Sequence, residues 1–136
     1  LWFTTDVGLV KFDSHKFELF NTDKGISDNE IFQMKTDFKG RTWLLTLSGK
    51  LSFIYKNKIY NENNSSLIKQ VSGSGIAADF YEDKNHFIYI TFRNSQITII
   101  NPKNEVAKQK ITKKKQEGIW KYHNNICVLT VEGIYN

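Results

Sequence analysis

The chain has 136 residues, a formal net charge of +5 and a hydrophobic content of 40%. This length favours one domain, and this composition excludes wholesale disorder. Its one cysteine, Cys127, excludes an intrachain disulfide, and no apolar run approaches the ~18 residues that a membrane helix needs.

The first 29 residues read as three short strands and a polar loop. Gly8 ends the first strand with a tight turn, and a second turn falls at Ser14 and His15. The third strand alternates polar and apolar residues with a period of two. A loop at residues 21–29, rich in Asp, Asn, Gly and Ser, follows. The expected strands are residues 3–5, 9–13 and 16–20.

The same succession then starts again. A strand is expected from Ile31, and the turn at Lys39 and Gly40 leads into another strand at residues 42–46. No stretch combines helical periodicity with caps, and residues 76–82 share the register of the Ile31 strand. Residues 63–66, which contain glycosylation sequons on paper, are interpreted as an exposed linker.

Four threonines mark a repeat of 39 to 45 residues. An apolar residue stands three positions before each threonine, and a residue that tolerates positive φ stands three positions after it. The threonines are Thr5, Thr46, Thr91 and Thr130. The apolar residues are Trp2, Trp43, Ile88 and Cys127, and the turn residues are Gly8, Gly49, Asn94 and Gly133.

Units of ~40–45 residues with four strands each are the size of a propeller blade. We therefore expect an all-β fold, a β-propeller fragment of about three four-stranded antiparallel blades, which is an incomplete propeller. The expected blade pieces are residues 1–29, 30–75, 76–116 and 117–136. Since a propeller needs about four to eight blades, both ends read as cuts through a longer protein. Open edges would otherwise pair with another copy.

Three segments resemble the two-component regulator propeller repeat. Residues 1–13 match its strand and turn, residues 23–31 match its inter-blade loop, and residues 37–46 match the start of the next blade. The resemblance is close over residues 1–55. It is looser over residues 76–101, where Ile88 replaces the tryptophan, and weak over residues 118–136.

The resemblance implies the periplasmic sensor region of a bacterial hybrid or histidine kinase. It implies an extracytoplasmic ligand-sensing domain of a two-component signalling protein, responsive to carbohydrate, with the membrane reached only through segments outside this chain. The partners implied are a small polar ligand or oligosaccharide, the rest of the same propeller, and a second copy in a homodimer. We expect no nucleic-acid partner and no cofactor.

Residues that recur at the blade period are interpreted as structural. Trp2 and Trp43 are expected to pack in the core between neighbouring blades rather than to stack on sugars. The four threonines are expected to form hydrogen bonds within their blades, and Cys127 is expected to be a small buried hydrophobe.

The candidate ligand-binding residues lie in loops on one expected propeller face. Asp28 and Asn29 end the inter-blade loop, which also reads as an ordinary turn because Asp, Asn, Gly and Ser serve turns for local reasons. Arg93 is of most interest, since a guanidinium pairs well with carboxylate or phosphate. The candidates are Asp6, Asp28, Asn29, Ser48, Arg93 and Asn94.

The remaining polar features have ordinary interpretations. A lysine run is expected to guard a solvated strand edge on an outer strand and the loop after it. It comprises Lys108, Lys110, Lys113, Lys114 and Lys115. His15, His86 and His123 share no metal-ligand spacing, so we expect no metal site.

Two further function classes stay open. No catalytic motif is recognised, so the chain is expected not to be an enzyme by itself. Since propellers host both binding and catalysis, a propeller lyase or hydrolase with its active site largely outside this segment is one alternative. A protein-interaction scaffold that uses its rim or edge strands is the other.

Overall fold

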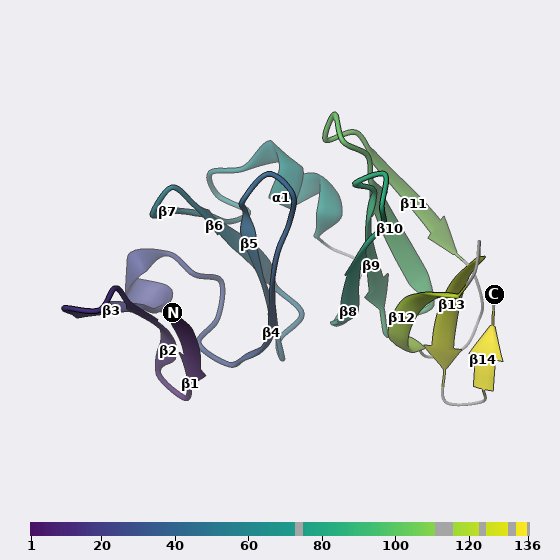
Figure 1. The fold of residues 1–136 in the computed structure, drawn as a ribbon. Helices are drawn as coiled ribbons and strands as arrows, with labels where there is room; N and C mark the ends of the chain where they lie inside the picture. The colour runs from purple at the N-terminus through teal and green to yellow at the C-terminus, as the bar shows by residue number, and fades with distance from the viewer. Residues whose placement is uncertain (73–74, 111–115, 123–124, 131–132, 136) are drawn as a thin grey trace. The chain divides into compact units, whose positions relative to one another are not determined.

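A computed structural model gives the fold of the chain (Figure 1). It describes residues 1–72, 75–110, 116–122, 125–130 and 133–135, with side chains described up to residue 110. Two compact units make up the chain, Leu1–Lys69 and Gln70–Asn136.

The first unit holds two antiparallel sheets. The three strands of the first sheet, in spatial order, are β1 (Trp2–Thr5), β2 (Gly8–Phe12) and β3 (Phe17–Phe20). The four strands of the second sheet are β4 (Ile31–Thr36), β5 (Thr42–Thr46), β6 (Leu51–Tyr55) and β7 (Lys58–Tyr60). Neighbours in the chain are therefore neighbours in each sheet.

The second unit repeats this arrangement. Its four-stranded sheet consists of β8 (Ala77–Glu82), β9 (Ile88–Phe92), β10 (Gln96–Ile100) and β11 (Val106–Lys110). Its three-stranded sheet consists of β12 (Gln116–Tyr122), β13 (Asn125–Thr130) and β14 (Gly133–Tyr135). β12 lies against β8 and β9, so these two sheets are neighbours within the unit.

The described strands confirm the predicted fold class. Every sheet is an up-and-down antiparallel meander, and the described residues form two sheets of four strands and two of three. This is the architecture of consecutive propeller blades. The chain is an all-β propeller fragment.

Two short helices were not expected from the sequence. The helix α1 (Ser66–Val71) begins directly after Ser65, whose hydroxyl accepts a hydrogen bond from the backbone N–H of Ile68 at 3.3 Å. Residues 63, 64 and 66 are exposed, as expected for a linker, but Ser65 caps a helix that the sequence interpretation did not include. The 3₁₀ helix η1 (Thr22–Lys24) lies within the predicted polar loop.

The core of the first unit lies between its two sheets. One buried cluster combines residues of β2, β3, the 21–30 loop, β4, β5 and β6, and Trp2 of β1 packs against it. Its buried members are Leu9, Phe20, Ile26, Ile31, Leu44 and Ile54. All five residues of β5 are buried, so both faces of this central strand are covered.

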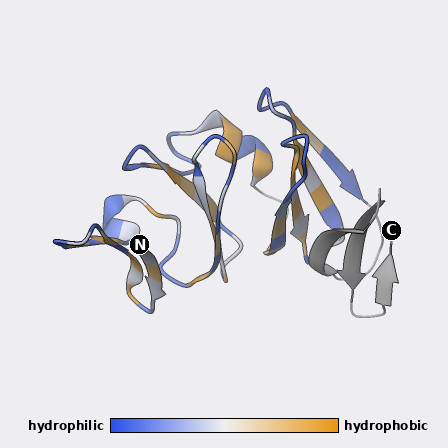
Figure 2. Cartoon of the chain, viewed as in Figure 1, coloured by the Kyte–Doolittle hydropathy of each residue, from blue (hydrophilic) through white to orange (hydrophobic). Residues whose placement is uncertain are grey.

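The second unit has a comparable core. β9 and β10 are its central strands, and Ile88, Ile90, Phe92, Ile97 and Ile100 are fully or almost fully buried. Figure 2 shows hydrophobic residues along the strands and α1, and hydrophilic residues in the connecting turns. The period-two alternation predicted for half-buried strands thus gives way to continuous burial in the central ones.

Four hairpin tips are closed by the same kind of turn. At each of them an Asp or Asn side-chain oxygen accepts a hydrogen bond from the backbone N–H two residues later, at 2.9–3.2 Å. Such Asx turns stabilise a reversal locally, which suits the tip of a β-hairpin. The four residues are Asp13, Asp37, Asp83 and Asn101.

Candidate functional site

In each unit, the candidate residues lie at the sheet ends opposite the turns at Asp13, Asp37, Asp83 and Asn101. Because each sheet is a meander, the turn between its second and third strands, the start of its first strand and the end of its last strand share one end. In the third sheet this end comprises the β9–β10 turn, the start of β8 and the end of β11. Ser48, Arg93 and Asn94 lie in turns at such ends of the four-stranded sheets, and Asp28 and Asn29 lie in the loop that enters β4. The sixth predicted ligand-binding residue, Asp6, lies in the β1–β2 turn.

Asp28 and Ser48 are brought together in the first unit. The Asp28 carboxylate accepts hydrogen bonds from the Ser48 hydroxyl and from the backbone N–H of Glu30, the latter at 3.1 Å. These bonds hold the pKa of Asp28 below its usual value, with the Ser48 hydroxyl as the largest cause. The Ser48 hydroxyl also lies 3.1 Å from the hydroxyl of Thr46.

Asn29 and Asp6 have different surroundings. The side-chain oxygen of Asn29 accepts a hydrogen bond from the backbone N–H of Thr22 at 2.9 Å, so Asn29 ties the loop to the start of η1. Asp6 is exposed in the two-residue turn between β1 and β2. A ligand-binding role for either residue remains a prediction.

Arg93 and Asn94 lie together in the β9–β10 turn of the second unit. Both are exposed, and the Arg93 backbone N–H bonds to the carbonyl of Ile76 at 2.9 Å. The Asn94 side-chain oxygen accepts a hydrogen bond from the backbone N–H of Gln96 at 3.2 Å. The predicted candidates therefore fall into a group in the first unit and a pair in the second.

The strand pairing shifts the predicted repeat by one residue between the second and third sheets. Trp43 lies opposite Phe53, and Tyr89 lies opposite Ile99, which gives an offset of 46 residues, from residue 43 to residue 89. Tyr89 rather than Ile88 thus takes the place of Trp43. By the same offset, Phe92 rather than Thr91 takes the place of Thr46.

The turn residues shift with the strands. Gly49 has a φ of 83° and Ser95 a φ of 71°, and each backbone N–H bonds to the carbonyl three residues earlier. Ser95 rather than Asn94 is therefore the counterpart of Gly49. Pairing with the first strand of each sheet shows the same register, since Thr46 lies opposite Ile31 and Phe92 lies opposite Ala77.

The threonine hydrogen bonds are present in two of the described repeats. Thr5 donates to the carbonyl of Gly8, and Thr46 donates to the carbonyl of Lys50, both at 2.8 Å. Gly8 thus takes the place of Lys50 rather than of Gly49. The hydroxyl of Thr91 is buried without a hydrogen-bond partner among the described residues, so the expected bond is not formed there.

The last repeat is described by its backbone alone. Thr130 lies opposite Gly133, as Thr5 lies opposite Gly8, and Cys127 lies opposite Trp120. The side chains of these residues, and those of His123, Lys113, Lys114 and Lys115, lie outside the part that the structure describes. Lys108 and Lys110 are exposed on β11, the outer strand of its sheet.

Two equivalent recesses, which sequence reasoning missed, lie at these sheet ends. The first-unit recess has a volume of about 440 Å³ and lies between the 22–27 loop, Lys50 and the residues that follow β7. The second-unit recess has a volume of about 420 Å³ and lies between the β9–β10 turn and the end of β11. The lining residues of the latter are Asn94, Gln96, Lys108, Gln109 and Lys110.

The strand register makes the lining positions correspond. Tyr60 pairs with Phe53 as Ala107 pairs with Ile99, so residues 61–63 correspond to residues 108–110. Lys50, Asn61, Glu62 and Asn63 in the first recess thus correspond to Gln96, Lys108, Gln109 and Lys110 in the second. The lining residues of each recess come from separate segments of the chain. The only signal that could have predicted them is the turn geometry that the two units share.

An equivalent contact holds the wall of each recess. The Asn61 side-chain amide donates to the carbonyl of Gly25 at 2.8 Å, and the Lys108 ammonium donates to the carbonyl of Ser72 at 3.1 Å. In both units a side chain at the end of the outer strand thus bonds to the loop that enters the sheet. The backbone positions around the recess, which we call its frame, recur in both units, but the side chains at these positions differ.

No metal centre is found among the residues that the structure describes, since no three His, Cys, Asp or Glu side chains gather there. His86 lies 2.9 Å from Glu82, and His15 is exposed in its turn. Within the same described part, no helix is long and apolar enough to cross a membrane.

No protein-family model matches the sequence, and no curated protein matches it either. Solved structures are similar in fold. Two are the extracellular domain of BT4673 from B. thetaiotaomicron, named as a hybrid two-component system in one and a one-component system in the other. Their TM-scores are 0.78 and 0.77 and their identities 19% and 16%, over 98% of this chain and 20% of theirs.

A streptogramin B lyase is also similar, with a TM-score of 0.60 and 15% identity over 98% of this chain and 49% of that one. The chain thus spans about a fifth of the BT4673 domain and about half of the lyase. At such identities the likeness is one of fold. Together with the four antiparallel sheets, it identifies the chain as a segment of a β-propeller.

Proposed function

We propose that this chain is part of the extracytoplasmic ligand-sensing propeller of a two-component signalling protein. The observation that carries the proposal is the fold likeness, over 98% of the chain, to the extracellular domain of a hybrid two-component protein. The function of that whole protein is carried over as a hypothesis, since fold alone does not decide function.

In each unit, the recess at the end of the four-stranded sheet is a proposed ligand-binding site. Their linings are rich in amide and charged side chains, which can orient a polar ligand by several hydrogen bonds at once. We propose an oligosaccharide as the ligand, because hydroxyl groups on a ring both donate to and accept from Asn and Gln side chains. Asn94 lines the second-unit recess, and Asp28, Ser48 and Arg93 are close in sequence to lining residues of the recess in their own unit.

Calorimetric titration of the purified full protein with a panel of neutral and acidic oligosaccharides tests this proposal. We expect at least one saccharide to bind with a fitted stoichiometry near one. The Asn61→Ala and Gln96→Ala variants should weaken that binding at the first or second recess, while Asn104→Ala, at the opposite end of its sheet, should not. Silence of the whole panel would contradict the proposal.

A propeller lyase is the second candidate function, favoured by the fold likeness to streptogramin B lyase. The residues that the structure describes hold no group of three His, Cys, Asp or Glu side chains that could bind a metal ion, so this candidate rests on the fold likeness alone. Product analysis in the same titrations separates the two candidates. A sensor returns its ligand unchanged, whereas a lyase yields an unsaturated or ring-opened product.

A further inference from the structure

The second-unit recess has a distinctive charge. It contains two lysines, Lys108 and Lys110, and no carboxylate among its described lining residues. The equivalent first-unit recess pairs one lysine, Lys50, with one acid, Glu62. At neutral pH, where Lys and Glu side chains are ionised, the second-unit recess therefore carries a net charge of about +2 and the first-unit recess a net charge of about zero.

Lys108 is positioned rather than simply solvated. Its ammonium donates to the carbonyl of Ser72 at 3.1 Å, at the position where the first unit uses the neutral amide of Asn61. This contact fixes the Lys108 ammonium beside the Ser72 carbonyl. A lysine that serves only to keep a strand edge solvated has no need of such a fixed position.

Polar groups surround the two charges on the same face of the sheet. Gln96 pairs with Lys110, and Thr98 pairs with Lys108, so the side chains in each pair share a face. The hydroxyl of Thr98 is fully buried and does not line the recess, so Gln96 is the polar group that accompanies the two lysines on this face.

We propose that the second-unit recess binds the carboxylate or sulfate group of an acidic saccharide. The two ammonium groups take the anion, and the amides of Asn94, Gln96 and Gln109 take the hydroxyls of the sugar that bears it. This inference rests on the proposed sensing function and names its ligand class. It further assigns the anionic group to the second unit, since the first-unit recess has no excess of positive charge.

The test compares three probes on the full protein by calorimetry. They are a galacturonate hexasaccharide, a chondroitin sulfate hexasaccharide and neutral maltohexaose. We expect at least one of the acidic probes to bind and maltohexaose to bind at least 10-fold more weakly. Charge-assisted hydrogen bonds of ordinary strength give a 10- to 100-fold difference in affinity.

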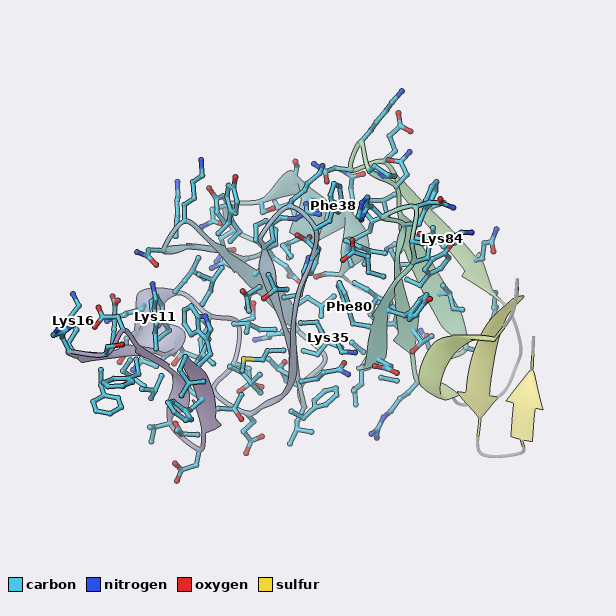
Figure 3. All side chains as sticks on the ribbon, in the orientation of Figure 1. Lys11, Lys16, Lys35, Phe38, Phe80 and Lys84 are labelled. Atoms are coloured by element: carbon cyan, nitrogen blue, oxygen red, sulfur yellow. The ribbon has the colours of Figure 1, made fainter. Side chains whose placement is uncertain are left out.

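The matched variants are Lys108→Gln/Lys110→Gln and Lys84→Gln/Lys103→Gln. Both remove two positive charges from the same sheet, but Lys84 and Lys103 lie in the turns at its opposite end (Figure 3, Lys84). We expect the first variant to lose at least 10-fold in affinity for the acidic probe and the second to change it less than 2-fold. Circular dichroism and the urea midpoint should remain unchanged in both.

Several results would overturn the inference. An equal loss in the two variants would reveal general charge attraction, and an unchanged affinity in Lys108→Gln/Lys110→Gln would place the anion elsewhere. Binding to anionic lipid vesicles that needs Lys108, with both acidic probes silent, would assign the lysines to a membrane surface. If maltohexaose binds and the acidic probes do not, the sensing function stands and this inference fails.

Discussion

The indole N–H of Trp43 donates a hydrogen bond of 2.8 Å to the carboxylate of Asp37, and both side chains are buried. The same carboxylate oxygen accepts a 2.6 Å bond from Arg41 Nε, and the Arg41 guanidinium lies over the rings of Trp43 and Phe53. In the second sheet the Asx turn is therefore part of the buried core.

Asp37→Ala should therefore cost far more stability than Asp83→Ala. The first change leaves the buried guanidinium of Arg41 without its carboxylate, which typically costs about 3–5 kcal/mol. Asp83 holds its turn through backbone N–H groups and a 3.5 Å contact with the Tyr89 hydroxyl, so we expect a loss of about 1–2 kcal/mol. Urea unfolding followed by tryptophan fluorescence measures both, and similar losses would refute this account of the turn.

Gly8 and Gly40 provide a matched pair for backbone strain. Both have positive φ, but a Cβ at Gly8 would lie 2.4 Å from the carbonyl oxygen of Phe20, whereas one at Gly40 would meet nothing within 4 Å. Gly40→Ala should cost about 1 kcal/mol, the usual penalty of left-handed backbone. Gly8→Ala should cost at least about 2 kcal/mol more, since backbone must move. Thermal unfolding of the two variants checks the order.

Thr46 and Thr91 form a matched pair, because the hydroxyl of Thr46 forms a hydrogen bond and that of Thr91 has no described partner. Thr46→Val removes a bond to the Lys50 carbonyl and should destabilise the protein by about 1 kcal/mol. Thr91→Val replaces a buried hydroxyl that has no described partner, so it should be neutral or stabilising by up to about 1 kcal/mol. Denaturant midpoints compared at constant m-value distinguish them, and a clear loss in Thr91→Val would mean that its hydroxyl is bonded.

Ser48→Ala should raise the pKa of Asp28 towards its ordinary value. Asp28 in the folded chain has a lowered pKa because the Ser48 hydroxyl and backbone N–H groups bond to its ionised form. Its ionised carboxylate therefore contributes stability above the unfolded pKa of about 3.9, and this contribution is lost as the pH falls through the folded pKa.

Carboxyl carbon chemical shifts followed by NMR between pH 2 and pH 6 measure this change; the range spans about two pH units on each side of the unfolded value. Asp13 is the internal control, since backbone N–H groups of Lys16 and His15 lower its pKa and Ser48 takes no part. An Asp28 titration that is identical in the parent and in Ser48→Ala would show that the hydroxyl does not bond to the carboxylate.

The sequence allowed the sheets to be predicted because turn residues and alternating strands carry local signals. Gly8, Gly49 and the Asx residues mark reversals by backbone chemistry alone. The helix α1 was missed because its six residues are too few to display a periodic apolar face, and the cap at Ser65 resembles a polar linker.

The exact register and the recesses could not be predicted in the same way. Thr91 and Thr46 look equivalent in sequence, yet the strand pairing places Phe92 opposite Ala77 as Thr46 lies opposite Ile31. The recess joins the end of β11 to the β9–β10 turn, and Asn94 was predicted without Gln96 and Gln109 beside it. Such a site depends on which strand ends meet, and residue spacing alone does not carry that information.

The most direct test of the proposed role is to map which end of the sheets meets the ligand. Amide chemical-shift changes in the full protein, titrated with the acidic hexasaccharide that binds, should concentrate at Asn94, Gln96 and residues 108–110. Changes concentrated instead in the Asx turns at residues 37–41 and 83–87 would place the ligand at the opposite end and contradict the account.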